Sequence, residues 1–599
     1  MCGIFGYVGH IAGGGGAGAD AAGIVLRGLK KLEYRGYDSW GIAVARESGV
    51  ALERHVGKIG EASVALPPSP VGVGHTRWAT HGGVTEPNAH PHLDCSGRLA
   101  LIHNGIVANY RELRDTLDLS RHRLKSETDT EVIVHLLEDR LAGTPEGPDR
   151  LVAALMSVFR QLEGLNAVAV LDVQSGRLAV AKSGSPIVLG WGERGNFLAS
   201  DYSALLEHTR RVTFLDDGQA ALIEDRAIRV FDVASGAEIS PDVSDIEWEA
   251  AAAELSGYPD FLSKEIHEQP AVLRRLGAEW AAHVRGLAGM LGDAREVFTV
   301  GCGTAGHAAL AAQYLLARIA GRRLTFATGS EFSYLQDFVT DGALVMAFSQ
   351  SGETIDVIDA VRDAKRRKAK VAAIVNVEGS SLWRMADRAF PIGAGPERCV
   401  LSTKSFTGKL AILLMAAHEM IGRLDVGASL VQAAAEETER LLRDERRTLI
   451  RRIAEQIHRH EHLFVIGRGP SYPLALEAAL KIKEVSYIHA EGFAGGELKH
   501  GVIALIEPGT PALVLAPRDE TYDDVMSGAL QMKARGAMIV GVSPDPHEAF
   551  DAHIPVADLG PATAIINAVP AQLLGYYLCL LRGHDPDKPR NLAKSVTVK

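Results

Sequence analysis

The chain has 599 residues, a formal net charge of −11 and 47% hydrophobic residues. This length predicts several domains with buried cores, and the acidic balance without a basic stripe disfavours a nucleic-acid partner. The five cysteines are scattered with no C-x-x-C pair, which argues against a disulfide framework or a zinc site and favours a reducing cytoplasm. No apolar run is expected to reach the ~18 residues of a membrane span; the longest candidate is Leu410–Ala417. The N-terminus lacks the basic region of a signal peptide.

The second residue, Cys2, is the first feature that suggests chemistry. Removal of Met1 gives a chain that begins with a cysteine, which carries a thiol and a free α-amine on one Cα. An α-amine has an ordinary pKa near ~8 and can act as a base, and a thiol is a strong nucleophile once deprotonated. Cys2 can therefore combine a nucleophile and its base, although a chance cysteine at a frayed terminus is the alternative.

The first section, residues 2–241, alternates short β-type runs with turns. Examples are Gly41–Ala45, Leu99–His103 and Ala167–Leu171, and two helices are expected near 22–32 and 130–141. Many strands with few helices predict stacked sheets with helices outside. The run Gly13–Gly18 reads as a surface loop, since it lacks the Lys-Ser/Thr ending of a phosphate-binding loop.

Polar clusters follow several of these apolar runs, at the points where strands end and loops begin. Functional sites often lie at such positions. Arg77 and Asp129 suit the carboxylate and the ammonium of an amino acid. Asn104 and Gly105 offer a side-chain amide and an unhindered backbone N–H that can stabilise an oxyanion. Each feature has a purely structural alternative: Asn-Gly is a hairpin signal, and Ser126 can cap a helix that starts near Thr130.

Together these motifs resemble the class II glutamine amidotransferase domain, whose fold is the αββα sandwich of the N-terminal-nucleophile hydrolases. The motifs are Cys2-Gly3-Ile4, Glu33–Ser39, His75–Gly82, His103-Asn104-Gly105 and Glu127-Thr128-Asp129. The resemblance implies that Cys2 attacks the glutamine side-chain amide, forms a thioester and releases ammonia, with its own α-amine as the base. It implies an oxyanion hole from Asn104 and Gly105, and a glutamine site of Arg77, Thr80, His81 and Asp129.

After a weakly patterned acidic stretch near 225–254, which we interpret as an inter-domain connection, helices alternate with short buried strands. Continuous apolar strands such as Val297–Val300, Ala343–Phe348 and Val371–Val375 predict a doubly wound parallel α/β sheet. The same alternation of short buried strands and helices recurs from Leu463 onward, so we infer two copies of one domain. The expected boundaries are 242–284 for a linker and helical connection, 285–425 and 426–585 for the two copies, and 586–599 for a C-terminal tail.

In the first copy, Ser349-Gln350-Ser351-Gly352-Glu353-Thr354 follows a buried strand and opens a helix expected at Ile355. Hydroxyls, a glycine and helix N-terminal amides in one turn can cradle a phosphate, at the strand ends where open parallel sheets bind ligands. A plain N-cap turn is the alternative. Gly301-Cys302-Gly303-Thr304 is a second such turn, in which Cys302 reads as a packing residue rather than a nucleophile.

The second copy contributes three ionisable candidate groups, and the tail after it contributes a fourth. Lys481 and Glu484 lie three residues apart on one helix face, where a surface salt bridge is the alternative reading. His500 can be a structural histidine. The chain ends in an apolar tail with Lys594 amid small residues, which can dock and present a Schiff-base amine.

The second section resembles a pair of sugar isomerase (SIS) domains, and the order of all domains resembles the family of isomerizing glutamine–fructose-6-phosphate aminotransferases. The motifs are Ser349–Thr354, Ser402-Thr403-Lys404, Leu480–Glu484, Glu491–Gly501 and Asn591–Val598. The resemblance implies a homodimer that converts L-glutamine and fructose 6-phosphate without a cofactor or metal. The implied roles are phosphate binding by Thr304, Ser349, Gln350, Ser351 and Thr354, ring opening by a neighbouring subunit's His500, imine formation by Lys594, proton transfer by Glu484 with help from Lys481, and gating of an ammonia channel by Trp78.

Three residues depart from the family pattern: Ala305 stands where Ser is usual, Val502 where Pro is usual, and Trp40 where a small residue is common. Ala305 removes one phosphate hydroxyl, and Trp40 can reshape the approach to Cys2. Two other readings stay open, an amidotransferase for another keto-sugar phosphate and a sugar-phosphate sensor without turnover.

Overall fold

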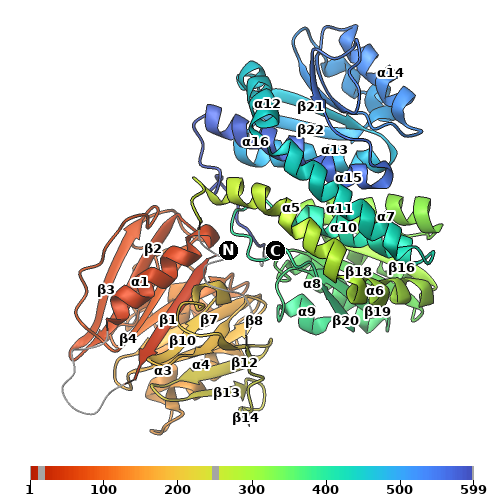
Figure 1. Cartoon of the computed structure of the whole chain (residues 1–599). Helices are drawn as coiled ribbons and strands as arrows, with labels where there is room; N and C mark the ends of the chain where they lie inside the picture. The colour runs from red at the N-terminus through yellow and green to blue at the C-terminus, as the bar shows by residue number, and fades with distance from the viewer. Residues whose placement is uncertain (1, 11–19, 246–254, 597–599) are drawn as a thin grey trace. The chain divides into compact units, whose positions relative to one another are not determined.

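The computed structural model describes residues 2–10, 20–245 and 255–596, and the predicted loop Gly13–Gly18 lies outside these ranges. The chain divides into two compact units (Figure 1), one of Met1–Glu254 with Ala593–Lys599 and one of Leu255–Leu592.

Two antiparallel sheets form the framework of the first unit. In spatial order, the eight-stranded sheet contains β15 (Ser244–Asp245), β11 (Arg211–Phe214), β9 (Val188–Trp191), β10 (Gly195–Ala199), β1 (Gly3–Gly9), β4 (Val71–Arg77), β2 (Ser39–Arg46) and β3 (Gly49–Val56). The seven-stranded sheet contains β14 (Glu238–Ile239), β13 (Ile228–Asp232), β12 (Gln219–Ile223), β8 (Arg177–Ser183), β7 (Asn166–Asp172), β6 (Leu99–Gly105) and β5 (His92–Leu93).

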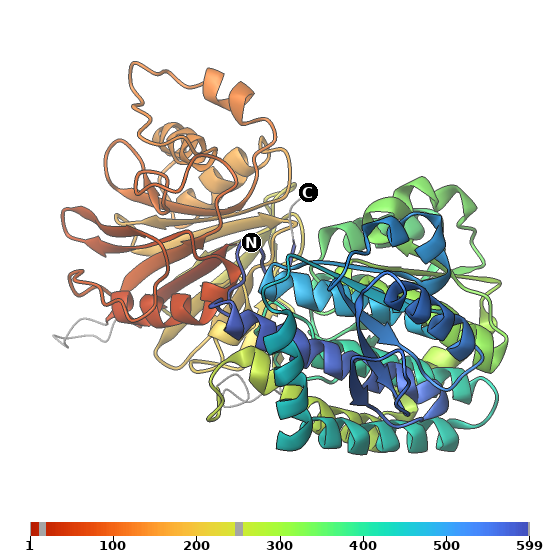
Figure 2. The same cartoon turned by 90° about the horizontal axis from the view of Figure 1, so that it is seen from above.

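The two sheets pack face to face, and helices cover their outer faces (Figure 2). Alternate residues of both sheets, among them Ile4, Val73 and Ile102, share one buried apolar cluster, as expected for strands with one face on a common core. Helix α1 (Ala21–Leu32) packs on β1 and β4. Helices α2 (Tyr110–Asp115), α3 (Thr130–Ala142) and α4 (Arg150–Phe159) join a cluster with the other face of the seven-stranded sheet. The predicted αββα sandwich is confirmed.

The expected strands and both expected helices are present, but one interpretation is wrong. Residues 225–254 were expected to form a connection, yet Ile228–Asp232 is a strand that pairs with β12 and β14. The alternation in this run is only five residues long, and acidic neighbours obscure it. Of the rest of the predicted connection, residues 246–254 lie outside the described part of the chain.

The second unit contains two five-stranded parallel sheets with the same strand order, which supports the inferred duplication. The first contains β17 (Thr325–Thr328), β16 (Glu296–Gly301), β18 (Ala343–Ser349), β19 (Lys370–Val375) and β20 (Arg388–Pro391). The second contains β22 (His489–Ala494), β21 (His462–Gly467), β23 (Pro511–Leu515), β24 (Met538–Ser543) and β25 (Ala552–Pro555).

Helices cover both faces of these sheets, which is why the strands read as continuous apolar runs. In β18, Leu344 and Met346 belong to one core cluster and Val345 to another. The helices are α5 (Phe261–Glu279), α6 (Ala281–Asp293), α7 (Gly303–Ala320), α8 (Ile355–Arg366), α9 (Ser381–Met385), α10 (Lys404–Glu419), α11 (Leu424–Leu441), α12 (Asp444–Ile457), α13 (Tyr472–Ser486), α14 (Tyr522–Lys533), α15 (Thr563–Ile566) and α16 (Ala568–Leu581). The predicted doubly wound folds are confirmed.

One helical stretch, Gly560–Leu581, is long and apolar enough to cross a membrane by length and composition alone. It exceeds the Leu410–Ala417 run that was expected to be the longest. In the structure 89% of its most apolar window is buried, and α16 packs against α12 and α13. This stretch is therefore a core helix of the second unit.

The segment after α16 is anchored at the N-terminus of α5. The Asp587 carboxylate accepts hydrogen bonds from the backbone N–H groups of Phe261 (2.8 Å) and Leu262 (2.9 Å), and Asp260 caps the same helix through Ser263 N–H. These bonds satisfy donors that a helix start leaves unpaired. Burial nevertheless raises the pKa of Asp587 to about 6.

This raised pKa predicts how stability varies with pH. A folded-state pKa above the usual ~4 means that protonation favours folding, so the contribution is present below pH ~4 and is lost as the pH rises through about 6. Asp587→Asn should therefore lose less free energy of unfolding between pH 4 and 7 than wild type, measured by urea unfolding. Asp425→Asn, at an exposed first-turn position of α11, is the control. An unchanged pH profile in Asp587→Asn would contradict the assignment.

Candidate functional site

Cys2 lies at the start of β1, beside the end of β4. The Trp78 backbone N–H donates to the Cys2 Sγ at 3.1 Å, and Sγ lies 3.6 Å from the Trp78 carbonyl oxygen. Gly3 N–H donates to the Thr76 hydroxyl at 2.9 Å, which holds the first residues against β4. Burial raises the pKa of the Cys2 thiol, while the Trp78 N–H and the Arg77 charge act in the opposite direction. Deprotonation of this thiol therefore requires a base at the site.

The end of β6 brings Asn104 to Cys2 from the other sheet. Asn104 Nδ2 donates to the Cys2 carbonyl at 2.9 Å. Gly105 follows with φ +138°, and a Cβ there would lie 2.1 Å from the Leu165 carbonyl oxygen, so only glycine fits. A side-chain amide bonded to the Cys2 carbonyl and a glycine that no other residue can replace thus follow one another at the end of β6, and the oxyanion hole stays a prediction.

His75, part of a predicted motif but not of the predicted site, orients this amide. Its Nε2 lies 3.0 Å from both Asn104 Oδ1 and the His103 carbonyl oxygen. Because both partners are acceptors, Nε2 carries the proton, and burial lowers the His75 pKa to about 3, which keeps the ring neutral. His75 thereby fixes which end of the Asn104 amide faces Cys2. The contact crosses between sheets, so sequence spacing gave no signal for it.

The predicted glutamine-binding residues surround the same strand end. The Arg77 guanidinium donates to the carbonyl oxygens of Gly83 (3.0 Å), Gly82 (3.1 Å) and His81. Asp129 is 3% exposed, and its carboxylate accepts from Val107 N–H at 2.8 Å. Arg77 therefore shapes the loop after β4, and its role toward a substrate carboxylate stays a prediction.

The remaining residues of this region are Thr80, His81 and Trp78. Thr80 is exposed, and the His81 ring meets the Tyr110 ring edge-on at 5.4 Å. Trp78 is half-buried, and its backbone rather than its ring contacts Cys2. The gating role of Trp78 stays a prediction.

The suggested cap by Ser126 is wrong. Asp129 directly precedes α3, and the Ser126 hydroxyl instead donates to Glu131 at 2.8 Å. Glu131 also accepts from the backbone N–H groups of Lys125 and Ser126. The side chain of the helix thus holds the preceding loop, the reverse of the expected arrangement.

In the second unit, the predicted phosphate loop lies between β18 and α8. The Ser349 hydroxyl accepts from Gly352 N–H at 2.9 Å and lies 3.0 Å from the Thr354 hydroxyl. Ser351 accepts from Glu353 N–H at 3.2 Å. Thr354 precedes α8 without a side-chain cap bond, and phosphate binding by this loop stays a prediction. Ser349, Ser351 and Thr354 gather at a helix N-terminus, with Gln350 between them.

The predicted pair of Lys481 and Glu484 is present, but it is not a surface pair. Lys481 Nζ lies 2.6 Å from Glu484 and 3.6 Å from Glu477, and the lysine side chain is 1% exposed. Burial opposes the charge of Lys481, but the two carboxylates outweigh burial and raise the lysine pKa. Lys481 is therefore a buried ammonium paired with two carboxylates, and the carboxylate of Glu477 is also bonded to Thr304 and His307 of α7.

Glu477 is a site residue that sequence analysis missed. It accepts from the Thr304 hydroxyl at 3.1 Å and lies 2.7 Å from His307 Nδ1. It links α7 of one copy to α13 of the other. Its spacing of four residues from Lys481 places both on one helix face. This signal was present in the sequence, but only the pair Lys481/Glu484 was singled out. Since Thr304 is bonded to Glu477 here, its phosphate role stays a prediction.

The remaining candidate residues are His500, Lys594, Cys302 and Trp40. His500 ends a 3-10 turn and is exposed, and Lys594 is half-buried in the tail that groups with the first unit. Neither placement tests the predicted roles. Cys302 packs on a core cluster, and burial raises its pKa to about 11, which supports a packing role. Trp40 is 3% exposed and stacks on His55 at 4.5 Å.

Fold and site together define a glutamine amidotransferase unit joined to a duplicated phosphosugar-type α/β unit. Residues 75–207 match the glutamine amidotransferase domain model, and residues 290–419 and 456–582 match the SIS domain model. A C-terminal domain of glucosamine-fructose-6-phosphate aminotransferase from Francisella tularensis superposes with a TM-score of 0.52 and 30% identity, covering 56% of this chain and 99% of that one.

Two curated relatives are similar over their whole length. The glutamine–fructose-6-phosphate aminotransferases (isomerizing) of Thermus thermophilus and Pyrococcus horikoshii are each 40% identical to this chain, with 100% of both chains covered. The chain belongs to the family of isomerizing glutamine–fructose-6-phosphate aminotransferases.

The His75 contact predicts a selective defect. His75→Leu removes the donor that orients Asn104, so kcat for glutamine hydrolysis should fall roughly 10–100-fold, with little change in KM. Sugar-phosphate isomerisation should be unchanged. His208→Leu, which alters a histidine that stacks on Phe197 instead, should keep near-normal hydrolysis. Equal hydrolysis in His75→Leu and wild type would refute the positioning role.

Gly352 predicts a defect confined to the sugar-phosphate loop. It has φ +71°, and a Cβ there would lie 1.9 Å from the Ser380 hydroxyl oxygen. Gly352→Ala should weaken fructose 6-phosphate binding by ~10-fold or more, since a strained, displaced loop misplaces Ser349 and Thr354. Gly321→Ala has a similar φ of +61° with open space around it, so it reports backbone strain alone. Isothermal titration that found both variants equal would rule out the clash.

Proposed function

We propose that this chain hydrolyses glutamine at Cys2 and uses the ammonia to convert fructose 6-phosphate to glucosamine 6-phosphate. The observation that carries the proposal is the meeting of Cys2, Asn104 and Gly105 at the ends of strands from two sheets. The full-length similarity to isomerizing aminotransferases supports the pairing of this site with a sugar-phosphate site on the same chain.

In the glutamine half, the Cys2 thiol gives its proton to the residue's own α-amine, and Sγ attacks the amide carbon of glutamine. Asn104 Nδ2 and Gly105 N–H stabilise the oxyanion. The C–N bond then breaks, the protonated α-amine returns its proton to the departing amide nitrogen, which leaves as ammonia, and water hydrolyses the thioester to glutamate. Met1 must be removed first, because a peptide nitrogen cannot act as this base. Arg77, Thr80, His81 and Asp129 hold the substrate.

In the sugar half, the predicted phosphate loop, Ser349–Thr354, holds the phosphate at the N-terminus of α8. The proposed phosphate ligands are Thr304, Ser349, Gln350, Ser351 and Thr354. The partner subunit's His500 helps to open the ring, and Lys594 forms an imine with C2. Ammonia displaces the lysine, and Glu484 carries a proton from C1 to C2, which yields an aldose. The buried Lys481 ammonium stabilises the carboxylate of Glu484 and the developing charge near O1.

The two halves must be coupled, because ammonia released into water at neutral pH is protonated and no longer nucleophilic. We therefore propose a dry internal passage, gated by Trp78, between the sites. Shared use of His500 requires a homodimer. We also propose a cytoplasmic location, where both substrates are available and the Cys2 thiol stays reduced.

A second candidate is a glutamine-dependent amidotransferase for another keto-sugar phosphate. The observation that favours it is Ala305, which lacks a hydroxyl in the first turn of α7. The site therefore has one hydrogen-bonding group fewer for the phosphate than is usual in the family. A panel of ketose phosphates, assayed for amino-sugar formation, separates the two candidates. A sensor without turnover is disfavoured by the presence of Cys2, Glu484, His500 and Lys594.

Product analysis tests the proposal directly. Protein mixed with glutamine and fructose 6-phosphate should yield glucosamine 6-phosphate and glutamate, identified by mass spectrometry. Cys2→Ala should lose glutamine use by more than ~10³-fold but keep sugar isomerisation. Glutamate and ammonia without amino sugar would refute the aminotransferase function, and loss of both activities in folded Cys2→Ala would refute two separate sites.

A further inference from the structure

A second cluster of reactive side chains lies in the first unit, apart from the residues assigned to glutamine. It consists of Cys95 in the turn between β5 and β6, His122 in the segment between α2 and α3, and His135 and Glu138 on α3. One potential ligand atom from each residue lies within 4.8 Å of the other three. Both histidine side chains are 2% exposed, whereas Cys95 is exposed.

Four distances within the cluster match edges of a tetrahedron around a metal. Cys95 Sγ lies 3.6 Å from Nδ1 of both His122 and His135, and Glu138 Oε2 lies 3.3 and 3.4 Å from the same two nitrogens. Tetrahedral zinc with Zn–S ≈ 2.3 Å and Zn–N/O ≈ 2.0–2.1 Å requires edges of about 3.6 Å between S and N and about 3.3 Å between N and O. All four measured edges fit.

Carboxylates also stand behind the two histidines. His122 Nε2 lies 2.9 Å from Asp139, and His135 Nε2 lies 3.8 Å from Glu131; both nitrogens are within ion-pair reach without the alignment of a hydrogen bond. Metal-bound histidines commonly have such carboxylate partners on the second ring nitrogen, where they set the tautomer and the ring orientation. With Nε2 protonated toward these carboxylates, Nδ1 of each ring presents its lone pair to the centre of the cluster.

We propose that Cys95, His122, His135 and Glu138 bind one Zn²⁺ in a closed structural site. One thiolate, two imidazoles and a carboxylate in tetrahedral array favour zinc over magnesium or calcium, which prefer oxygen ligands in larger coordination shells. Four protein ligands leave no open position for a reacting water. Binding replaces the Cys95 S–H proton by the metal and releases that proton to solvent.

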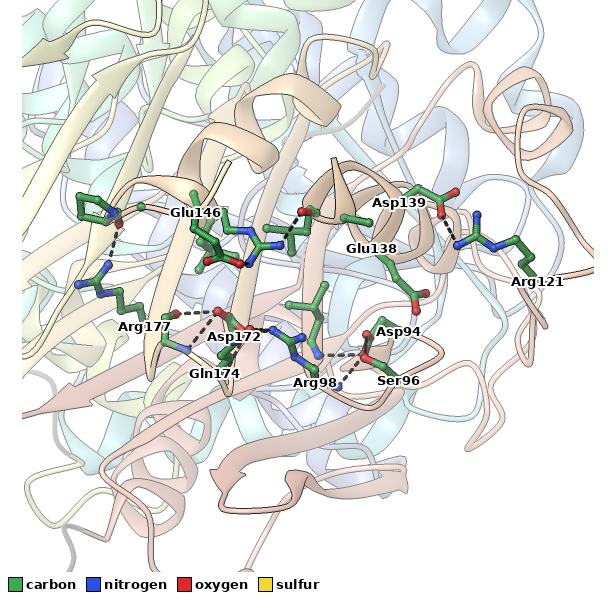
Figure 3. Close-up of a pocket in the computed structure, with 18 residues that line it drawn as sticks. Asp94, Ser96, Arg98, Arg121, Glu138, Asp139, Glu146, Asp172, Gln174 and Arg177 are labelled. Carbon is green, nitrogen blue, oxygen red and sulfur yellow. Dashed lines mark hydrogen bonds and ion pairs between the residues drawn. The ribbon is translucent and has the colours of Figure 1, made fainter. Parts of the chain in front are cut away.

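A cavity lies beside the cluster, with Glu138 as the cluster residue that lines it. The cavity has a volume of about 450 Å³, and Figure 3 shows Glu138 and Asp139 among the residues that line it, with Arg121 3.8 Å from Asp139. The cavity is lined mostly by polar and charged side chains, which suits the approach of a hydrated cation. Cys95 is the exposed residue of the cluster, so a metal can reach the cluster without unfolding of the unit.

The site would fasten three segments that spacing alone does not connect. It joins the turn after β5 and the 116–129 segment to α3, and the 116–129 segment ends at Asp129, a proposed glutamine ligand. The expectation of no zinc site rested on the lack of a C-x-x-C pair, but here a single cysteine meets histidines from two other segments. Zinc would therefore stabilise the first unit and hold Asp129 without taking part in catalysis.

The test uses the full-length protein, stripped with a chelator and titrated with Zn²⁺ or Co²⁺. We expect about one metal ion per chain, as one tetrahedral ligand set implies, a sulfur-to-cobalt charge-transfer band, and a zinc-dependent rise in Tm. Cys95→Ala and His135→Gln should each weaken binding by more than ~100-fold and abolish the Tm shift. Cys302→Ala and Cys2→Ala should bind as wild type does.

Two outcomes would overturn the proposal. If wild-type protein binds no zinc and shows no Tm shift, the cluster is only a hydrogen-bond network and the proposal is refuted. Zinc binding that persists in Cys95→Ala but is lost in Cys2→Ala would place the metal at the N-terminal thiol and amine. Circular dichroism of the stripped variants verifies folding, and His122→Gln provides an independent ligand change should Cys95→Ala be unstable.

Discussion

The amidotransferase site depends on the position of β1 in the middle of a sheet. This strand follows Cys2 directly, is buried along its whole length and pairs with β10 on one side and β4 on the other. Chain ends normally fray, but here the backbone ladder holds Gly3 against Thr76 and so places Cys2 Sγ on the Trp78 N–H. The opposing sheet then needs only one strand end, that of β6, to bring Asn104 to the same point.

The second unit depends on buried charge instead. An ammonium in a protein interior is costly unless paired, and removing one partner typically costs several kcal/mol. Lys481 meets this requirement with Glu484 and Glu477, and Glu477 in turn receives the hydroxyl of Thr304 from the other copy of the domain. The duplicated sheets thus share one polar cluster, so neither copy forms this site alone.

Much of this could be predicted from the sequence, because apolar runs reveal parallel strands and because motifs at strand ends mark sites. Ser349–Thr354 and the pair Lys481/Glu484 illustrate this. His75 could not be recognised, since its role is a contact between strands of different sheets. Glu477 gave a spacing signal toward Lys481, but its bond to Thr304 joins elements distant along the chain and was not visible in the sequence. The strand Ile228–Asp232 was hidden by its acidic neighbours, and the cluster around Cys95 becomes visible only when three segments are brought together.

The central claim is that two chemistries on one chain are coupled through ammonia that does not mix with solvent. The most direct measurement supplies glutamine labelled with ¹⁵N in the amide, fructose 6-phosphate, and a large excess of unlabelled ammonium. The proposed coupling predicts amino-sugar product that carries nearly the ¹⁵N enrichment of the glutamine amide. Product with the isotope ratio of the bulk ammonium would contradict it.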